Sequence, residues 1–318
     1  PLMQRSGVRT VLDEYAGWRR LRAQVKKAKR VATPSAPPAY TERYGIYANP
    51  SRAALAARLK ACGEDVRLLN LSSRLARLRM LKQPAELAAM QAAIDITIAA
   101  MKETLRPAKC PTYNHEYEIE AELTRGFRRR GAAGHSFEPI IAGGPRACTL
   151  HSVTNNSPLG ADELVVIDVG AEVEHYAADI TRTVSLSKPS RRQRQVHKAV
   201  LEVQQFALDL LKPGALLKDY EQAVRHYMGE QLVRLGLIKA NTPKNVQKFY
   251  PHGTSHFIGL NVHDAGDHEQ PLQPGVVVSC EPGIYIPQEG IGVRIEDDVL
   301  ITETGNRVLT AKLPRDLV

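Results

Sequence analysis

The sequence has no long hydrophobic run. None of its apolar stretches reaches the ~18 residues that a membrane-spanning helix needs, and the first thirty residues, although rich in Arg and Lys, contain no uninterrupted apolar core. We therefore expect neither a membrane protein nor a secretory signal. Asp13 and Glu14 interrupt the basic stretch and also argue against an organelle-targeting segment. The chain opens on Pro1, which leaves open whether this is its native start.

Cysteine is scarce, and internal repeats are missing. The four cysteines are far apart and form no C-x-x-C pair: Cys62, Cys110, Cys148 and Cys280. They could make two disulfides, but a chain of this size does not need such cross-links, so we expect reduced thiols in the cytoplasm. The absence of a repeat at a solenoid period and of any low-complexity tract excludes repeat architectures.

The net charge of +9 is concentrated near the N-terminus. Residues 1–80 hold 17 Lys and Arg against 5 Asp and Glu, whereas the remainder holds 26 against 29. A nucleic-acid surface is conceivable in the basic part. However, apolar residues such as Leu12, Tyr15 and Leu21 recur there at roughly helical spacing, which favours the solvated face of an amphipathic helix. We therefore do not expect nucleic acid as a partner.

Residues 1–80 read as a short N-terminal segment. We predict a basic helix over Val8–Val31, a linker in the breaker-rich TPSAPPAY, a strand in RYGIYA, a helix over Arg52–Cys62 and a strand in VRLLNL. The last three elements form a β-α-β fragment that is too small for an independent domain.

Residues 81–318 read as one larger α+β domain. Helices are predicted over Pro84–Leu105, Asn114–Arg130, Arg191–Leu211 and Lys218–Leu235. Between and after them lie strand patterns in PIIAGG, ELVVIDVGAEV, HYAADITRTVSL, VVVSCEPGIYI and GVRIEDDVLIT. Strand runs separated by pairs of helices predict a curved, antiparallel-rich sheet with helices on its outer face.

Four carboxylates stand within these strand patterns. They are Asp168 after LVVI, Asp179 in AADITRTV, Glu281 after VVVSC and Glu296 within GVRIEDDVLI. A carboxylate in an apolar run is costly to bury unless it is paired or bound to a metal. A single strand-end Asp usually caps a turn or pairs with Arg, but four carboxylates near a histidine cluster favour a metal site.

The histidine cluster lies in HGTSHFIGLNVHD, which contains His252, His256 and His263. An H-x-x-x-H pair on a helix could imitate a zincin site, but that motif needs Glu directly after the first His, and Gly253 stands there. We predict instead a loop that enters a strand. One His among several carboxylates is an oxygen-rich ligand set, which favours Mn²⁺ or a similar ion over a Cys-bound structural zinc.

These motifs resemble those of the Xaa-Pro aminopeptidases and prolidases, the pita-bread metallopeptidases. The resemblance covers residues 82–318 and rests on HGTSHFIGLNVHD, EPGIYI, GVRIEDDVLIT and the Asp–x₁₀–Asp spacing in IDVGAEVEHYAADITRT. It implies a pita-bread fold and a centre of two divalent ions, most simply Mn²⁺, with Co²⁺ or Zn²⁺ as alternatives. Asp168 would bind one ion, His256 and Glu281 the other, and Asp179 and Glu296 would bridge them.

The resemblance also implies a substrate and an activity. His151, His252, His263 and Arg294 match positions that line the substrate site, and the substrates would be peptides with proline at the second position. Two ions ~3.5–4 Å apart would activate a water, Glu281 would accept its proton, and His252 and His263 would hydrogen-bond the carbonyl and the developing oxyanion. The leaving nitrogen of proline is a tertiary amide without N–H, so the ring's shape must be recognised instead.

Other activities remain open. A methionine aminopeptidase shares the fold and ligand types, but His252 four residues before His256, the sequence EPGIYI and Arg294 oppose it. A prolidase, which cleaves only dipeptides, is not well separated by the sequence. A non-catalytic pita-bread protein that binds RNA or protein would have lost ligands, and creatine hydrolysis on this fold needs no metal, so the complete ligand set disfavours both.

Relatives carry an N-terminal domain of well over a hundred residues, whereas only about 80 precede the catalytic domain here. We expect a homodimer from the resemblance, although the short N-terminal part leaves the oligomeric state open. The same feature leaves open the preferred peptide length, and the sequence does not fix the metal.

Overall fold

The computed structural model describes residues 7, 10–34, 51–106 and 108–317. The chain divides into two compact units, Pro1–Ala76 and Arg77–Val318. In the described part, no helix is both long and apolar enough to cross a membrane. All four cysteines are free thiols, as the sequence predicted.

The first unit contains a small parallel β-α-β arrangement. Its elements are α2 (Glu14–Ala28), β1 (Arg30–Thr33), α4 (Ser51–Lys60) and β2 (Arg67–Asn70), and β1 pairs with β2 in parallel. Val25, Leu59 and Cys62 form its small core. Helix α5 (Ser72–Met80) follows and contains the boundary between the units.

The predicted basic helix over Val8–Val31 needs correcting at both ends. It begins at Glu14 rather than at Val8, because Asp13 is extended and its side chain accepts the Ala16 N–H as an N-cap. The basic helix does not continue to Val31, because Lys29 adopts a left-handed conformation (φ 58°) that ends α2 and lets Arg30–Thr33 form β1. The helix predicted over Arg52–Cys62 and the strand in VRLLNL are confirmed as α4 and β2. Most of the predicted linker and the whole strand in RYGIYA lie outside the described residues.

The second unit is built from pairs of helices on small antiparallel sheets. The helices are α6 (Pro84–Thr104), α7 (Glu116–Arg129), α8 (Arg191–Leu210), α9 (Leu217–Arg234) and the short α10 (Pro243–Gln247), with 3₁₀ turns η1 (Cys110–Thr112), η2 (Gly144–Cys148) and η3 (Pro287–Glu289). The four long helices confirm the predicted ones. Their starts follow from the sequence: Pro84 occupies the first turn of α6, and Ser190 and Gln193 cap α8 reciprocally.

The strands of this unit fall into four sheets. Their bounds are β3 (Gly134–His135), β4 (Ile140–Gly143), β5 (Leu164–Val169), β6 (Ala171–Val173), β7 (Tyr176–Ala177), β8 (Ile180–Ser185), β9 (Val277–Cys280), β10 (Gly283–Ile286), β11 (Ile291–Arg294), β12 (Asp297–Ile301) and β13 (Asn306–Val308). The sheet orders are β4-β5-β8, β13-β12-β9, β3-β6-β7 and β10-β11, and the neighbouring strands in them pair antiparallel. The predicted single sheet is therefore divided into short sheets.

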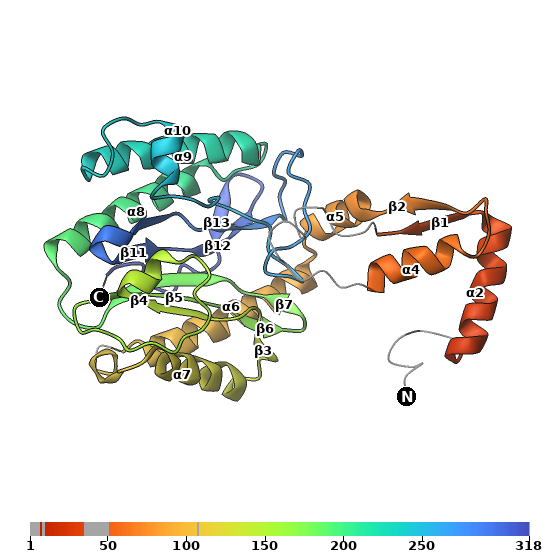
Figure 1. The fold of residues 1–318 in the computed structure, drawn as a ribbon, viewed down its shortest axis with the longest axis horizontal. Helices are drawn as coiled ribbons and strands as arrows, with labels where there is room; N and C mark the ends of the chain where they lie inside the picture. Colours follow the sequence, from red (N-terminus) through yellow and green to blue (C-terminus); the bar gives the residue numbers. More distant parts are fainter. Residues whose placement is uncertain (1–6, 8–9, 35–50, 107, 318) are drawn as a thin grey trace. The chain divides into compact units, whose positions relative to one another are not determined.

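Two hydrophobic cores hold the helices against the strands. One joins α8 and α9 to strands β9–β12, and the other joins α6 and α7 to β4, β5 and β8. Figure 1 shows the same arrangement, with α8 beside β11 and with α7 beside β3 and β4. The strands thus lie between two outer helix pairs.

Candidate metal centre

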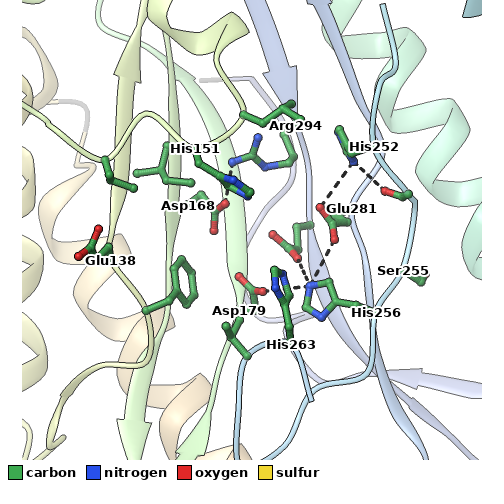
Figure 2. A pocket seen from close by; sticks show the side chains of 17 residues that line it. Glu138, His151, Asp168, Asp179, His252, Ser255, His256, His263, Glu281 and Arg294 are labelled. Carbon is green, nitrogen blue, oxygen red and sulfur yellow. Dashed lines mark hydrogen bonds and ion pairs between the residues drawn. The ribbon is translucent and has the colours of Figure 1, made fainter. Parts of the chain in front are cut away.

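One cavity of about 510 Å³ gathers the predicted site residues. All nine line it: His151, Asp168, Asp179, His252, His256, His263, Glu281, Arg294 and Glu296. Phe137, Ile140, Leu150, Val153 and Val262 add an apolar wall. Figure 2 shows most of the labelled polar side chains pointing toward one another across the cavity.

The four carboxylates come from strands that lie side by side. Asp168 is in β5, Asp179 directly precedes β8, Glu281 directly follows β9, and Glu296 lies between β11 and β12. The pairing of β5 with β8 sets Asp168 opposite Thr181, and the main-chain N–H of Glu296 donates to the Thr181 carbonyl at 3.0 Å. Residues 128 positions apart in the sequence therefore meet at one place.

His256 lies at the centre of this cluster. Its Nε2 is 3.4 Å from Asp179 Oδ2, 3.3 Å from Glu281 Oε1 and 3.9 Å from Glu296 Oε1. Ligand atoms of Asp179, His256 and Glu296 all lie within 4.8 Å of one another, so these three side chains could hold one metal ion. His252 and His256 lie in a loop, as predicted, and a helical zincin motif is excluded.

The buried carboxylates lie close enough to repel one another, and burial also disfavours their ionised form. Burial and the neighbouring negative charges raise the pKa of Asp179 and of Glu296 well above the usual range. Burial above all raises the pKa of Glu281 to about 8. One oxygen each of Asp168, Asp179 and Glu296 is buried without a hydrogen-bond partner. These orphaned oxygens beside an imidazole nitrogen fit a divalent ion bound by hard oxygen ligands.

The histidines are held in the neutral form. Burial lowers the pKa of His252 and of His256 to about 3, and it also lowers the pKa of His263. A neutral imidazole can offer a nitrogen lone pair to a metal or an N–H to a substrate. These are the two roles that a hydrolytic site needs.

A buried hydrogen-bond chain supports the far side of the cavity. Arg294 pairs with Asp168 Oδ2 at 2.6 Å and donates to the Tyr285 hydroxyl at 3.0 Å. Tyr285 also hydrogen-bonds His252 Nε2 at 2.8 Å. The sequence motif EPGIYI contains Tyr285 but did not indicate a role for it. The one available signal was the place of Tyr285 in that strand-like motif.

Two further hydroxyl groups orient the charged side chains. Thr181 Oγ1 donates to Glu296 Oε2 at 2.6 Å. Ser279 Oγ accepts the His256 main-chain N–H at 3.0 Å and donates to Glu281 Oε1 at 3.3 Å. Sequence reasoning missed both, because Ser and Thr in a strand pattern carry no distinguishing signal.

Comparison with known proteins agrees with this geometry. The sequence profile of metallopeptidase family M24 matches residues 88–303. The chain belongs to metallopeptidase family M24. This M24 chain is 39% identical over 272 residues to a Xaa-Pro aminopeptidase of Haemophilus influenzae, which covers 79% of this chain and 62% of that protein. It is 38% identical over 254 residues to the Xaa-Pro aminopeptidase of Escherichia coli, covering 74% and 57%.

Solved structures of other proteins identify the fold. The zinc-substituted aminopeptidase P of E. coli in complex with product superposes with a TM-score of 0.84 at 30% identity, covering 99% of this chain and 74% of that one. The predicted pita-bread fold and the predicted family are thereby confirmed, and membership of family M24 implies divalent metal ions. The M24 chain spans about three fifths of the length of these curated relatives.

Proposed function

We propose that this M24 protein is a metal-dependent aminopeptidase that removes the residue preceding a proline at position two. The observation that carries the proposal is the meeting of His256 with Asp179, Glu281 and Glu296 in a cavity of peptide-binding size. The names of its relatives, Xaa-Pro aminopeptidase in H. influenzae and E. coli, support the substrate class.

The residues that would hold the ions are Asp168, Asp179, His256, Glu281 and Glu296. The family resemblance assigns Asp179 and Glu296 to the bridging positions of a two-ion centre, and each of these carboxylates has one buried oxygen without a hydrogen-bond partner. Divalent ions bound there would lower the pKa of an attacking water and polarise the scissile carbonyl. Four carboxylates to one imidazole favour Mn²⁺, with Co²⁺ or Zn²⁺ as alternatives.

The protein's own groups would handle the protons and the charge. Glu281 is the acceptor of the proton released as attack begins, since its carboxylate lies at the cluster and is oriented by Ser279. His252, held by Tyr285, and His263 are the donors that stabilise the oxyanion as neutral imidazoles. Arg294 holds Asp168 by a buried ion pair, so it also fixes one wall of the site.

Recognition of proline would rest on the apolar wall. Phe137, Leu150 and Val153 line the same cavity as the charged cluster. The nitrogen of a proline in a peptide bond has no N–H to donate. A site selective for proline therefore needs no carbonyl to accept a hydrogen bond there, and can recognise the ring through contacts with apolar side chains and neutral histidines.

A peptide panel tests the proposal. Xaa-Pro dipeptides, longer Xaa-Pro-Yaa peptides and matched Xaa-Ala-Yaa controls are incubated with the chain and Mn²⁺, Co²⁺ or Zn²⁺. We expect release of the first residue only when proline follows, and fastest with Mn²⁺. Cleavage confined to dipeptides would point to a prolidase, and equal cleavage of the alanine controls would contradict proline selectivity.

A further inference from the structure

One face of α9 holds the loop that carries His252 and His256. Glu221 and Arg225 are one turn apart on this helix, so their side chains project from the same face. Both reach the segment from Tyr250 to Ser255, which has no regular secondary structure. Figure 2 shows His252, Ser255 and His256 along one stretch of chain at the cavity edge.

Glu221 binds the part of the loop next to His256. Its Oε1 accepts the main-chain N–H groups of Thr254 at 2.6 Å and Ser255 at 3.0 Å. Its Oε2 accepts the Thr254 hydroxyl at 3.0 Å. Two successive N–H groups on one carboxylate fix the peptide planes on either side of Thr254, just before His256.

Arg225 binds the part of the loop at His252. Its guanidinium donates to the carbonyl of Tyr250 at 3.0 Å and to the carbonyl of His252 at 2.9 Å. The same group lies over the Tyr250 ring, 5.0 Å from its centroid. The loop is therefore held by acceptors at one end and by donors at the other.

We infer that Glu221 and Arg225 are positioning residues, Glu221 for the His256 imidazole and Arg225 for the His252 imidazole. The Arg225 half of the inference rests on the proposed function, because His252 acts there on substrate. Neither residue lines the cavity, so each acts through the loop it holds.

The arrangement favours positioning over a purely structural role. Burial raises the pKa of Glu221 against the hydrogen bonds that lower it, so the ionised carboxylate is kept at a desolvation cost. An apolar residue would fill that space at lower cost to folding if the loop conformation were unimportant. Groups that orient a metal-binding imidazole typically change metal affinity ~10–100-fold when removed.

The test compares four full-length variants with the unaltered chain. Glu221→Ala removes the acceptors, Glu221→Gln keeps one oxygen to accept the N–H groups, and Arg225→Gln removes the paired donors. Gln222→Ala changes an exposed neighbour on the same helix and is the control. Calorimetry of metal-free protein measures the Kd for Mn²⁺, thermal denaturation measures Tm, and Arg-Pro-Pro cleavage gives kcat and KM.

We expect different losses at the two ends of the loop. Glu221→Ala weakens Mn²⁺ binding by ~10-fold or more, and Glu221→Gln restores most of it. Arg225→Gln lowers kcat by ~10-fold or more while the Mn²⁺ Kd stays within about threefold of the parent value. Gln222→Ala changes neither quantity.

A lower Tm with unchanged Mn²⁺ affinity and kcat would overturn the inference. Equal losses of Mn²⁺ affinity in Glu221→Gln and Glu221→Ala would also overturn it. If Glu221→Ala does not fold, the Glu221 half of the inference is overturned, because the residue is then needed for folding itself, and Arg225→Gln still decides the other half. A chain that binds Mn²⁺ as expected in all variants but cleaves no proline peptide would contradict the proposed function and leave the Glu221 inference standing. Full cleavage with unchanged Mn²⁺ affinity in Glu221→Ala would contradict the Glu221 inference and leave the proposed function standing.

Discussion

At the scale of single residues, His256 and its carboxylate neighbours decide the chemistry. We predict that Asp179→Ala or Glu296→Ala reduces bound metal from two ions per chain to one or none and abolishes peptide cleavage. Each change removes a carboxylate from the group of three side chains whose ligand atoms lie within 4.8 Å of one another. Metal content by atomic emission and folding by circular dichroism check the outcome. Asp219→Ala, an exposed carboxylate on α9, is the control, and full activity in either site variant would contradict a two-ion centre.

The buried carboxylates also predict how the stability of the metal-free protein depends on pH. Burial raises the pKa of folded Glu281 to about 8 from an ordinary value of 4.5. Between these values the unfolded chain has released a proton that the folded chain keeps, so the free energy of unfolding falls as pH rises. Histidines with a lowered pKa act in the opposite sense, and their effect fades as the pH rises above 6.5.

We therefore expect the free energy of unfolding of the metal-free protein to fall by on the order of 1 kcal/mol between pH 6.5 and 8. Urea denaturation at both pH values measures it. Saturating Mn²⁺ removes this loss, because an ion replaces the protons on the carboxylates. Stability that rises over this interval without metal would show that the carboxylates are already ionised in the folded state.

His252 and His263 separate substrate chemistry from metal binding. His252 contacts Tyr285, and the His263 ring lies 4.4 Å from the His256 ring. We predict that alanine at either position lowers kcat by ~10²–10³-fold while the metal content stays at the parent level. Steady-state kinetics and metal analysis on the same preparations distinguish the two effects. Metal loss in His252→Ala would mean that His252 itself is a ligand.

At the scale of helices and strands, the amphipathic patterns predicted the long helices of residues 77–318 well. The four helices α6, α7, α8 and α9 matched the predicted ranges within two residues at each end. Strand β1 was not predicted, because the end of α2 depends on a left-handed Lys29, which no sequence pattern signals. Short elements such as α5 and β13 were not predicted, since packing rather than propensity holds them.

The acidic and histidine residues of the candidate site could be predicted from the sequence, but the residues that hold them in place could not. Asp168 and Glu296 stood out because a carboxylate in an apolar strand needs an explanation. Thr181, Tyr285 and Glu221 meet the site only through strand register and helix packing, which bring together residues far apart in the chain. No local pattern contains that information.

The turn between β5 and β6 is a structural element on which the site depends. A Cβ at Gly170 would overlap the carbonyl group of Ala178, the residue before Asp179. We predict that Gly170→Ala lowers the free energy of unfolding by about 1–3 kcal/mol through overpacking and weakens Mn²⁺ binding. The change would push the β7 end away and shift Asp179.

Gly305→Ala is the matched control, because no atom lies within 4 Å of the added Cβ. We expect it to change the free energy of unfolding by less than about 0.5 kcal/mol. Urea denaturation and calorimetry with Mn²⁺ measure both variants. Unchanged stability in Gly170→Ala would mean that the turn can relax without moving the ligand.

At the scale of the whole molecule, the excess of basic residues and the predicted site residues lie in different parts of the chain. The basic excess lies in residues 1–80, whereas the cavity and all nine predicted site residues lie within Arg77–Val318. The division of the chain into an N-terminal segment over 1–80 and a catalytic domain over 81–318 remains our proposal, and a homodimer remains a prediction from the family resemblance.

The most direct test of the account is the cleavage of two tripeptides by the Mn²⁺-loaded chain. Arg-Pro-Pro carries proline at the second position, and Met-Ala-Ser is the substrate type of a methionine aminopeptidase. Chromatography of the released first residue gives kcat/KM for each peptide. For a metal-dependent, proline-specific aminopeptidase we predict release of arginine from Arg-Pro-Pro and no release of methionine from Met-Ala-Ser. A chelator should abolish the cleavage. Release of methionine at an equal or greater rate, or cleavage that survives metal removal, would contradict this prediction.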